Sequence, residues 1–263
     1  MFLHSLTSPL EDIPSSLLDF RHIPPDGGRD TNESGQAQML EIGLAEESDL
    51  DDVAALLVEV FSQDVILADK DFSELEKTMI SGPLEMTNAY FRAVAYLEVL
   101  YTLRSRCGNR LRCGNLGISS DAVLIVIRNP AGEGAVVGVV ELGLRKPDGT
   151  LPTNWPFPNP WRREEPTAQA QPYMCNLAVS EESRGQGHGK QLVRLCEHIA
   201  HNCWRYGRMY LHVDLGNPVA SGLYKAMGYQ SMEEYDAPMW MRQLLGLPTI
   251  RYQCKRFASS SCL

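Results

Sequence analysis

The sequence predicts an α/β fold in which a central sheet is flanked by helices, and three stretches of the C-terminal half carry this prediction. Residues 172–179 are extended and apolar, and a glycine-rich turn leads from them into the amphipathic helical segment 192–204. Residues 208–214 alternate apolar and polar side chains, as a half-buried strand does. Residues 217–228 then carry the start and stop signals of another helix. Such alternation of strands and helices is typical of α/β domains.

The N-terminal segment has a different composition from the rest of the chain. Residues 1–36 are rich in Ser, Pro, Asp and Gly and lack a sustained periodicity, so we expect a disordered tail. Acidic residues such as Glu11 and Asp12 argue against an organelle transit peptide, which is poor in acids. No apolar run reaches the roughly 18 residues that a membrane span needs, so none is expected.

Charge and cysteine content narrow the function further. The formal net charge of −9 argues against a nucleic-acid partner, whose phosphates are also negative. It mildly favours cationic substrates such as amines. The seven cysteines are an odd number without metal-ligand spacing, which indicates free thiols in a reducing compartment. We therefore expect no metal site. The oligomeric state has no visible signature.

Between residues 39 and 120 the pattern predicts one strand and two helices. A short strand is expected at 39–45. Ser48 and Asp51 then have the spacing of a capping box, which opens a helix. A second helix is expected over 84–104, before a loop with Gly and Asn at 105–120. The first helix would turn five apolar side chains inward, namely those of Val53, Leu56, Leu57, Val60 and Phe61.

Two strands and a long connection follow in the middle of the chain. Strands are expected at 121–128 and 135–145. The segment 146–171 is polar and proline-rich but contains two tryptophans, so both a functional loop and a structural flap fit it. Near the C-terminus, residues 239–245 predict a helical turn and residues 249–257 a final strand.

The glycine-rich turn has the properties of an anion site. A strand, a glycine turn and a helix start expose backbone N–H groups at the positive end of a helix dipole. A P-loop would need Ser or Thr after Lys190, where Gln191 stands, and a dinucleotide fingerprint would need a third glycine that is missing here. The pattern present is Arg-x-x-Gly-x-Gly, formed by Arg184, Gly187 and Gly189.

This pattern resembles the acyl-CoA pyrophosphate loop of the GNAT superfamily of N-acetyltransferases. A second stretch resembles the other signature of that family, with Asn217 as N-cap, Tyr224 two helical turns later and Gly228-Tyr229 after the helix. A softer resemblance to plant and algal plastid members lies in the C-terminal strand around Cys254.

The resemblance covers residues 37–257, so we expect one acetyltransferase domain over that range and a short C-terminal tail at 258–263. It implies a mixed, mostly antiparallel sheet flanked by helices, in which two central strands splay apart to bind acyl-CoA. The expected co-substrate is acetyl-CoA. The residues expected to contact it are Leu177, Ala178, Val179, Arg184, Gly185, Gln186, Gly187, His188, Gly189, Lys190, Asn217 and Tyr224.

These residues would contribute in different ways. The segment from Leu177 to Val179 would act through its backbone groups, and Arg184 through its charge. His188 is expected to project to solvent, and Lys190 to add only a favourable field. Asn217 is explained by its N-cap role alone, which a contact with the pantetheine arm does not contradict.

Acetyl transfer to an amine needs a base, because an amine must be neutral to attack and lysine has a pKa near 10.4. His212 is the expected base, with Asp214 on the same strand face to orient its ring, and the resemblance implies that Tyr173 cooperates with it. Glu141 or a chain of water molecules is the alternative base. Tyr224 is the expected general acid, which protonates the departing thiolate. For each of these side chains the alternative to a catalytic role is simple packing in its strand or helix.

The resulting hypothesis is direct acetyl transfer from acetyl-CoA to an amine, without an acyl-enzyme. The favoured acceptors are protein N-terminal α-amines and lysine ε-amines. Two alternatives are a small-molecule acetyltransferase, acting on an arylalkylamine or a polyamine, and an acyl-CoA-binding sensor without activity. The resemblance implies a plastid location, whereas the absence of a recognisable transit peptide favours the cytoplasm.

Overall fold

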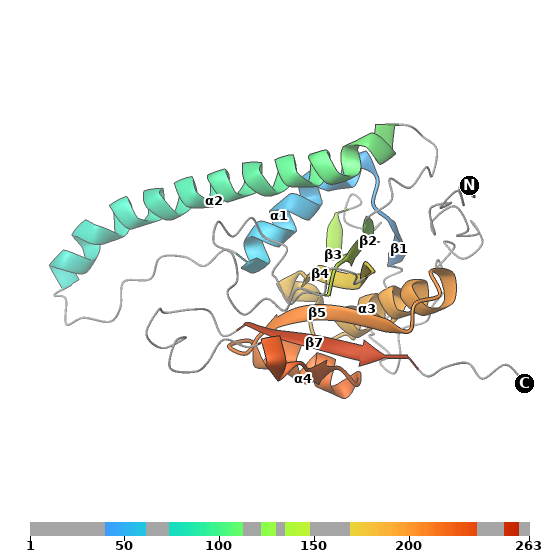
Figure 1. Cartoon of the computed structure of the whole chain (residues 1–263). Helices are drawn as coiled ribbons and strands as arrows, with labels where there is room; N and C mark the ends of the chain where they lie inside the picture. The colour runs from blue at the N-terminus through green and yellow to red at the C-terminus, as the bar shows by residue number, and fades with distance from the viewer. Residues whose placement is uncertain are drawn as a thin grey trace, which may run out of the picture.

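In the computed structural model the chain forms one seven-stranded sheet with helices on both faces (Figure 1). The structure describes residues 40–61, 74–112, 122–129, 135–147, 169–235 and 250–257, with the side chains of the long helix described from 85 to 104. The strands are β1 (Glu41–Leu44), β2 (Ala122–Arg128), β3 (Val136–Arg145), β4 (Gln171–Val179), β5 (Arg208–Asp214), β6 (Gln230–Ser231) and β7 (Ile250–Arg256). The helices are α1 (Leu50–Phe61), α2 (Glu74–Arg112), α3 (His188–His198) and α4 (Pro218–Ala226).

The sheet is mixed and mostly antiparallel, as the sequence predicts. Its strand order is β1-β2-β3-β4-β5-β7-β6. Within the described strands every neighbouring pair is antiparallel except β4 and β5 at the centre, which run parallel. A parallel pair needs a crossover connection, and α3 provides it between β4 and β5.

Each face of the sheet has its own apolar core. On one face, α1 and the C-terminal part of α2 pack against β2, β3 and β4 through residues that include Leu57, Leu103 and Val126. On the other face, α3 and α4 pack against the sheet through residues that include Leu192 and Met209. Figure 1 shows α1 and α2 on one side of the sheet and α4 on the other. Strand β3 is therefore buried on both faces, which explains its nearly continuous apolar run.

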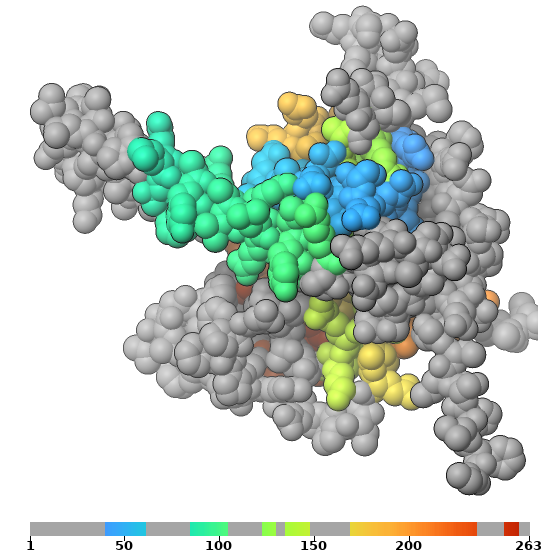
Figure 2. Space-filling view, turned by 90° about the horizontal axis from the view of Figure 1, so that it is seen from above, coloured from blue at the N-terminus to red at the C-terminus, as the bar shows by residue number. Residues whose placement is uncertain are grey.

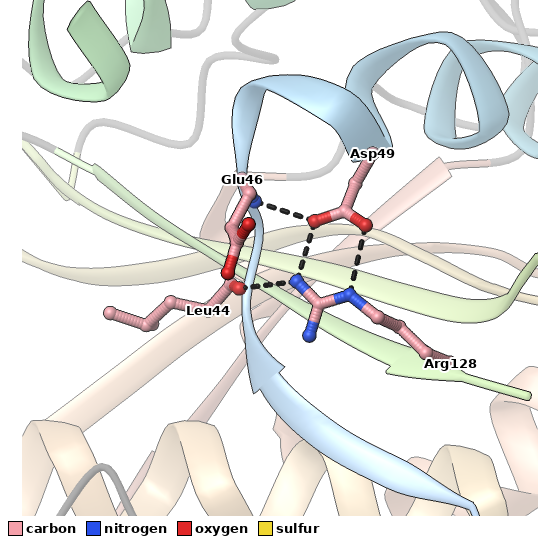
Figure 3. Close-up of polar contacts among 4 residues, drawn as sticks. All are labelled: Leu44, Glu46, Asp49 and Arg128. Carbon is pink, nitrogen blue, oxygen red and sulfur yellow. Dashed lines mark hydrogen bonds and ion pairs between the residues drawn. The ribbon is translucent and has the colours of Figure 1, made fainter. Parts of the chain in front are cut away.

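A partly buried ion pair ties the start of α1 to the sheet (Figure 3). The Arg128 Nε donates to Asp49 Oδ1 over 2.8 Å, and its Nη2 donates to the other carboxylate oxygen and to the Leu44 carbonyl. Asp49 also accepts a hydrogen bond from the backbone N–H of Glu46. The hydrogen bond to Asp49 raises the pKa of Arg128 above its ordinary value. Removing Arg128 would leave the carboxylate of Asp49, which is 6% exposed, without its counter-charge and would destabilise the fold.

This cluster corrects the predicted capping box. The turn that opens α1 is closed by Glu46 and Asp49, two residues before the expected pair Ser48 and Asp51. Asp51 instead lies on the helix surface and accepts a hydrogen bond from the Tyr96 hydroxyl of α2. The sequence does not show this shift, because Asp49 is fixed by Arg128, which is 79 positions away in the sequence.

The bounds of two helices differ from the prediction. Helix α2 covers Glu74–Arg112 rather than 84–104, so it continues into the segment expected to be a loop. Helix α3 begins at His188, four residues before the predicted start, because Gly187 already acts as its N-cap. The expected tails at 1–36 and 258–263, the central part of the long connection and the helical turn at 239–245 lie outside the described residues.

Candidate functional site

The central strands β4 and β5 separate after a short paired stretch. Only two register pairs join them, Tyr173 with Tyr210 and Met174 with Leu211. Beyond these pairs the described residues 175–179 of β4 and 212–214 of β5 form no ladder with each other. The expected splay of the two central strands is therefore present, and it exposes backbone N–H and C=O groups of β4 to a ligand.

A β-bulge in β4 marks the same place. Asn176 and Leu177 together lie opposite the single residue Val140, because Val139 pairs with Ala178 and Glu141 pairs with Cys175. Asn176 has a φ of 55°, in the left-handed region that Asn tolerates better than most residues. Its Nδ2 donates to Glu141 Oε2 over 2.8 Å, and Glu141 is only 3% exposed. The bulge bends β4 locally, as extra residues in a ladder do.

Tyr173 and His212 meet at this separation. The Tyr173 hydroxyl and His212 Nδ1 are 2.7 Å apart, and the tautomer of the ring decides which of the two donates. Their sequence positions are 39 residues apart, and the parallel pairing of β4 with β5 brings them together. Burial, followed by the charge of Cys175, raises the pKa of Tyr173 well above its ordinary value, so the phenol stays protonated.

Tyr252 forms the other side of the histidine environment. It pairs with His212 in the β5–β7 ladder, and the two ring centroids are 4.6 Å apart. Asp214, the predicted partner of the ring, accepts a hydrogen bond from the Gly216 N–H over 2.8 Å, which shapes the turn into α4. The contact found at Nδ1 is thus the Tyr173 hydroxyl.

Tyr224 comes to the site from the opposite face of the sheet. Asn217 caps α4 by accepting from the Ala220 N–H over 3.0 Å, and Pro218 begins the helix, as expected. Tyr224 belongs to the core on the α3–α4 face and is 6% exposed. Burial raises its pKa far above 10.

The glycine-rich loop has the backbone that the anion-site hypothesis needs. Gly185 and Gly187 have φ values of 78° and 84°, and a Cβ at either position would have no atom within 4 Å. The left-handed backbone at these two positions favours glycine, and the space beside that backbone is open to a ligand. Arg184 is exposed, and its Nε donates to the Val179 carbonyl over 3.2 Å.

His188 differs from its prediction. It is 7% exposed rather than projecting to solvent, and its Nε2 lies 2.9 Å from Gln186 Oε1. The reason is the early start of α3, which makes His188 the first helical residue and turns its ring inward across the loop. Gly189 is half-buried and Lys190 is exposed.

Three residues near the separation were not singled out from the sequence as site residues. Cys175 pairs with Glu141, and the Tyr173–Tyr210 register places it level with His212. Asn176 could have been suspected, because Asn is depleted in strands and tolerates positive φ. Cys175 and Tyr252 had no local signal, since their positions follow from pairing registers that the sequence does not show.

Other kinds of site find little support. Within the described ranges no three His, Cys, Asp or Glu side chains gather as a metal ion would require. No helix in the part of the chain that the structure describes is both long and apolar enough to cross a bilayer. The expected absence of a metal stays a prediction.

Comparisons with known proteins agree with this architecture. The sequence model of the Acetyltransferase (GNAT) family matches residues 93–229, more than half of the chain. The GCN5-related N-acetyltransferase 4, chloroplastic, of Arabidopsis thaliana is 37% identical over 68 residues. That match covers 26% of this chain and only 23% of the relative.

Solved acetyltransferase structures are similar at low sequence identity. The PaiA N-acetyltransferase of Thermoplasma acidophilum in complex with coenzyme A is 15% identical, with a TM-score of 0.47 over 83% of this chain and 99% of that one. The NatC complex bound to Gag peptide and CoA is 14% identical, with a TM-score of 0.46 over 83% of this chain and 99% of that one. Together with the match over 93–229, the sheet and its helices identify the chain as a member of the GNAT family of acetyltransferases, and hence as an acyltransferase enzyme.

Proposed function

We propose that the protein transfers the acetyl group of acetyl-CoA directly to an amine of a protein substrate, an N-terminal α-amine or a lysine ε-amine. The observation that carries this proposal is the 2.7 Å contact between Tyr173 and His212 at the point where β4 and β5 separate. The pair offers a proton acceptor beside unpaired strand backbone. Tyr224 approaches the same region from the other face.

The diphosphate of acetyl-CoA is assigned to the loop from Arg184 to Lys190. Its two left-handed glycines leave the backbone accessible, and α3 begins at His188, so amides of its first turn face the loop. Residues Leu177 to Val179 would provide backbone groups to the pantetheine arm and one N–H to the oxygen that gains charge. Asn217 already caps α4, and its side chain is committed to that role in part.

His212 is assigned as the base. The neutral imidazole accepts the amine proton, because an unperturbed histidine has a pKa near 6.5 and is mostly neutral at pH 7. Tyr173 keeps its own proton at that pH, since burial raises its pKa, and does not compete as a base. In the tautomer that this role requires, His212 Nδ1–H donates to the phenol oxygen, which orients the ring, and Nε2 accepts the amine proton. Glu141 is a weaker candidate, because it is 3% exposed and already accepts from Asn176.

Tyr224 is assigned as the acid. Its raised pKa means that it carries a proton throughout the physiological range, so it is a hydrogen-bond donor for the coenzyme A thiolate as the thioester bond breaks. Among the described residues its hydroxyl has no hydrogen-bond partner, although the ring packs edge-on against Tyr229 with centroids 5.7 Å apart. A buried hydroxyl of this kind is ready for a ligand.

Two observations support a plastid location and an amine acceptor. The segment that matches the chloroplastic N-acetyltransferase is short, but it supports the plastid-type resemblance and with it a plastid location. The net charge of −9 suits amine-bearing, cationic substrates. A fluorescent fusion of the whole chain in plant cells tests the location. A signal that stays outside plastids would contradict the proposed plastid location.

The decisive experiment compares acceptors directly. Thiol release from acetyl-CoA is measured with a peptide library and, in parallel, with serotonin and spermidine. Mass spectrometry of proteins acetylated in a bacterial host then separates α-amine from ε-amine sites. Turnover of peptides supports the proposal. Turnover of small amines alone would replace it with the small-molecule alternative, and tight acetyl-CoA binding without any turnover would point to a sensor.

The loop assignment has its own test. Replacing Gly187 with Val puts a β-branched residue at a φ of 84°, which costs about 1–2 kcal/mol and crowds the backbone that a phosphate must approach. We expect the KM for acetyl-CoA to rise at least about tenfold, with the acceptor KM little changed. Gly207→Ala is the matched control, because a Cβ there also meets nothing within 4 Å and no positive φ is involved. Equal effects of both substitutions would remove the loop from cofactor binding.

A further inference from the structure

Helix α2 carries an apolar stripe on the side that faces away from the domain. The stripe consists of Met86, Tyr90, Val94, Leu97 and Tyr101, whose exposed fractions run from 44% to 76%. At 3.6 residues per turn these five side chains fall within an arc of about 80° and extend along about 22 Å of helix. Single exposed apolar residues are ordinary, whereas an aligned set of this size marks an interaction surface.

The stripe is separate from the face that α2 uses inside the domain. Leu100 and Leu103 are buried against α1, and Tyr96 and Val99 pack beside them. By the same helical geometry this inner face is centred about 130° away from the stripe. The Tyr96 hydroxyl further anchors α2 to Asp51 of α1 over 2.9 Å. Folding of the domain therefore does not need the stripe.

The N-terminal half of the described helix also stands clear of the body. Figure 2 shows the N-terminal, teal part of the described helix projecting beyond α1, whereas its later, green part lies beside α1. From residue 85 to 94 the side chains are exposed around the helix, with Asn88 alone half-buried. A partner helix can therefore lie along the stripe without meeting the domain.

We propose that the stripe is the interface of a homodimer, in which α2 pairs antiparallel with α2 of a second copy about a twofold axis near Val94. In this arrangement Tyr90 lies opposite Leu97 and Met86 lies opposite Tyr101. The axis then passes between Ala93 and Val94, so the two copies of Val94 are neighbours across it. Each tyrosine ring then meets an aliphatic side chain, so the stripe is complementary to its own reverse. That match favours a second copy over an unrelated partner.

The area is sufficient for a dimer. The five stripe residues together present about 600 Å² of largely apolar surface on each copy, given that a whole aromatic side chain buries about 150–250 Å². Two copies would bury about 1,200 Å², at the lower end of the range of about 1,200–2,000 Å² for stable specific interfaces.

The first experiment measures the mass of the full chain by light scattering over a range of protein concentrations. We expect a dimer whose Kd rises at least about 30-fold in Leu97→Arg, because the charge enters the interface twice. The matched control is Ala89→Arg, which places the same side chain on an exposed position of the same helix outside the stripe. A wild-type monomer, or a dimer that survives Leu97→Arg, would overturn the proposal.

The second experiment tests the twofold register without destabilising anything. Val94→Cys brings two copies of the new thiol together at the axis, and mild oxidation should link the chains into a covalent dimer. Ala89→Cys is the control and should stay unlinked, because that side of the helix faces away from the partner. Linkage of Ala89→Cys and not of Val94→Cys would show that the antiparallel register is wrong.

Discussion

His212 and Tyr173 depend on each other for position as well as chemistry. The ring of His212 lies between the Tyr173 hydroxyl at 2.7 Å and the Tyr252 ring at 4.6 Å, so its rotation is restricted on two sides. A base held in this way needs no rearrangement before it accepts a proton.

If His212 is the base, His212→Ala should lower kcat by about 100-fold or more at neutral pH, the usual scale for a lost general base. Tyr173→Phe keeps the ring and removes only the hydroxyl, so a smaller fall is expected. Steady-state kinetics on the best peptide substrate measures both. His198→Ala is the control, because His198 contacts Asn202 on the α3 surface and should leave kcat unchanged. An unchanged rate in His212→Ala would take the histidine out of the mechanism.

Tyr224→Phe removes the proposed acid but leaves its ring packed against Tyr229. We expect kcat to fall about tenfold to 100-fold with little change in acetyl-CoA affinity, since the lost proton acts late in the reaction. Because the pKa of Tyr224 is raised, its ionisation should not limit the wild-type rate near pH 10. Tyr229→Phe is the neighbouring control. Loss of affinity with unchanged kcat would make Tyr224 a binding residue.

At this scale the sequence predicts residues whose role is local. The N-cap Asn217 and the stop glycine Gly228, with its φ of 87°, follow from the helix they bound. The Tyr173–His212 pair was named through the family resemblance, and the structure brings it together. Cys175 and Tyr252 escaped prediction, because their places depend on which residue of a neighbouring strand they face.

The bulge of β4 is the element that shapes the separation of the central strands. Its left-handed residue Asn176 is held by Glu141, a carboxylate buried on the adjacent strand. Because the bulge lies between the two paired positions and the loop, it sets the direction of the backbone from Leu177 to Val179. We expect kcat to depend more on the backbone geometry of the bulge than on the identity of its side chains.

Substitutions at the bulge separate these two possibilities. Asn176→Val should lower kcat at least about tenfold, because a β-branched residue resists a positive φ. Asn176→Gly keeps that backbone and should retain most of the activity. Glu141→Gln preserves an acceptor for Asn176, whereas Glu141→Ala leaves the buried amide unsatisfied and should cost about 1–3 kcal/mol of stability in thermal unfolding. Equal loss in Glu141→Gln and Glu141→Ala would instead favour Glu141 as the base.

Element boundaries were harder to predict than element types. Strands β2, β3, β4, β5 and β7 lie within about two residues of their expected bounds, since their apolar periodicity is strong. Gly108 and Asn109 are typical of loops, but helix α2 continues past them, because neither residue prevents a helix from continuing. Helix α3 starts early for the opposite reason, since its glycine is a cap rather than a part of the preceding turn.

At the scale of the whole molecule, periodicity predicts an α/β class but not a sheet order. The parallel contact of β4 with β5 at the centre follows from the family resemblance and from α3 as crossover. The ion pair of Arg128 with Asp49 has no counterpart in any local pattern. Long-range pairs of this kind form only after the sheet has brought distant segments together.

The buried tyrosines predict how the whole fold responds to alkali. Burial is the first cause of the raised pKa of Tyr173, Tyr224, Tyr229 and Tyr252. The unfolded chain releases these protons near pH 10 and the folded chain does not, so stability is complete below pH 10 and falls above it. Each pH unit beyond 10 should cost up to about 1.4 kcal/mol per buried tyrosine. Tyrosinate absorbance and circular dichroism should therefore change together in one cooperative step, and gradual ionisation without unfolding would contradict this expectation.

The clamp between Arg128 and Asp49 also sets the shortest piece of the chain that can stand alone. The stretch that the family pattern covers begins at residue 93, after the acidic partner has already been passed. A fragment that began there would leave the Arg128 guanidinium without its carboxylate partner. It would also lack β1, so the edge of β2 would be unpaired and open to self-association. The segment that the family model matches therefore lacks contacts that the fold needs, and a fragment for expression has to begin before Glu41.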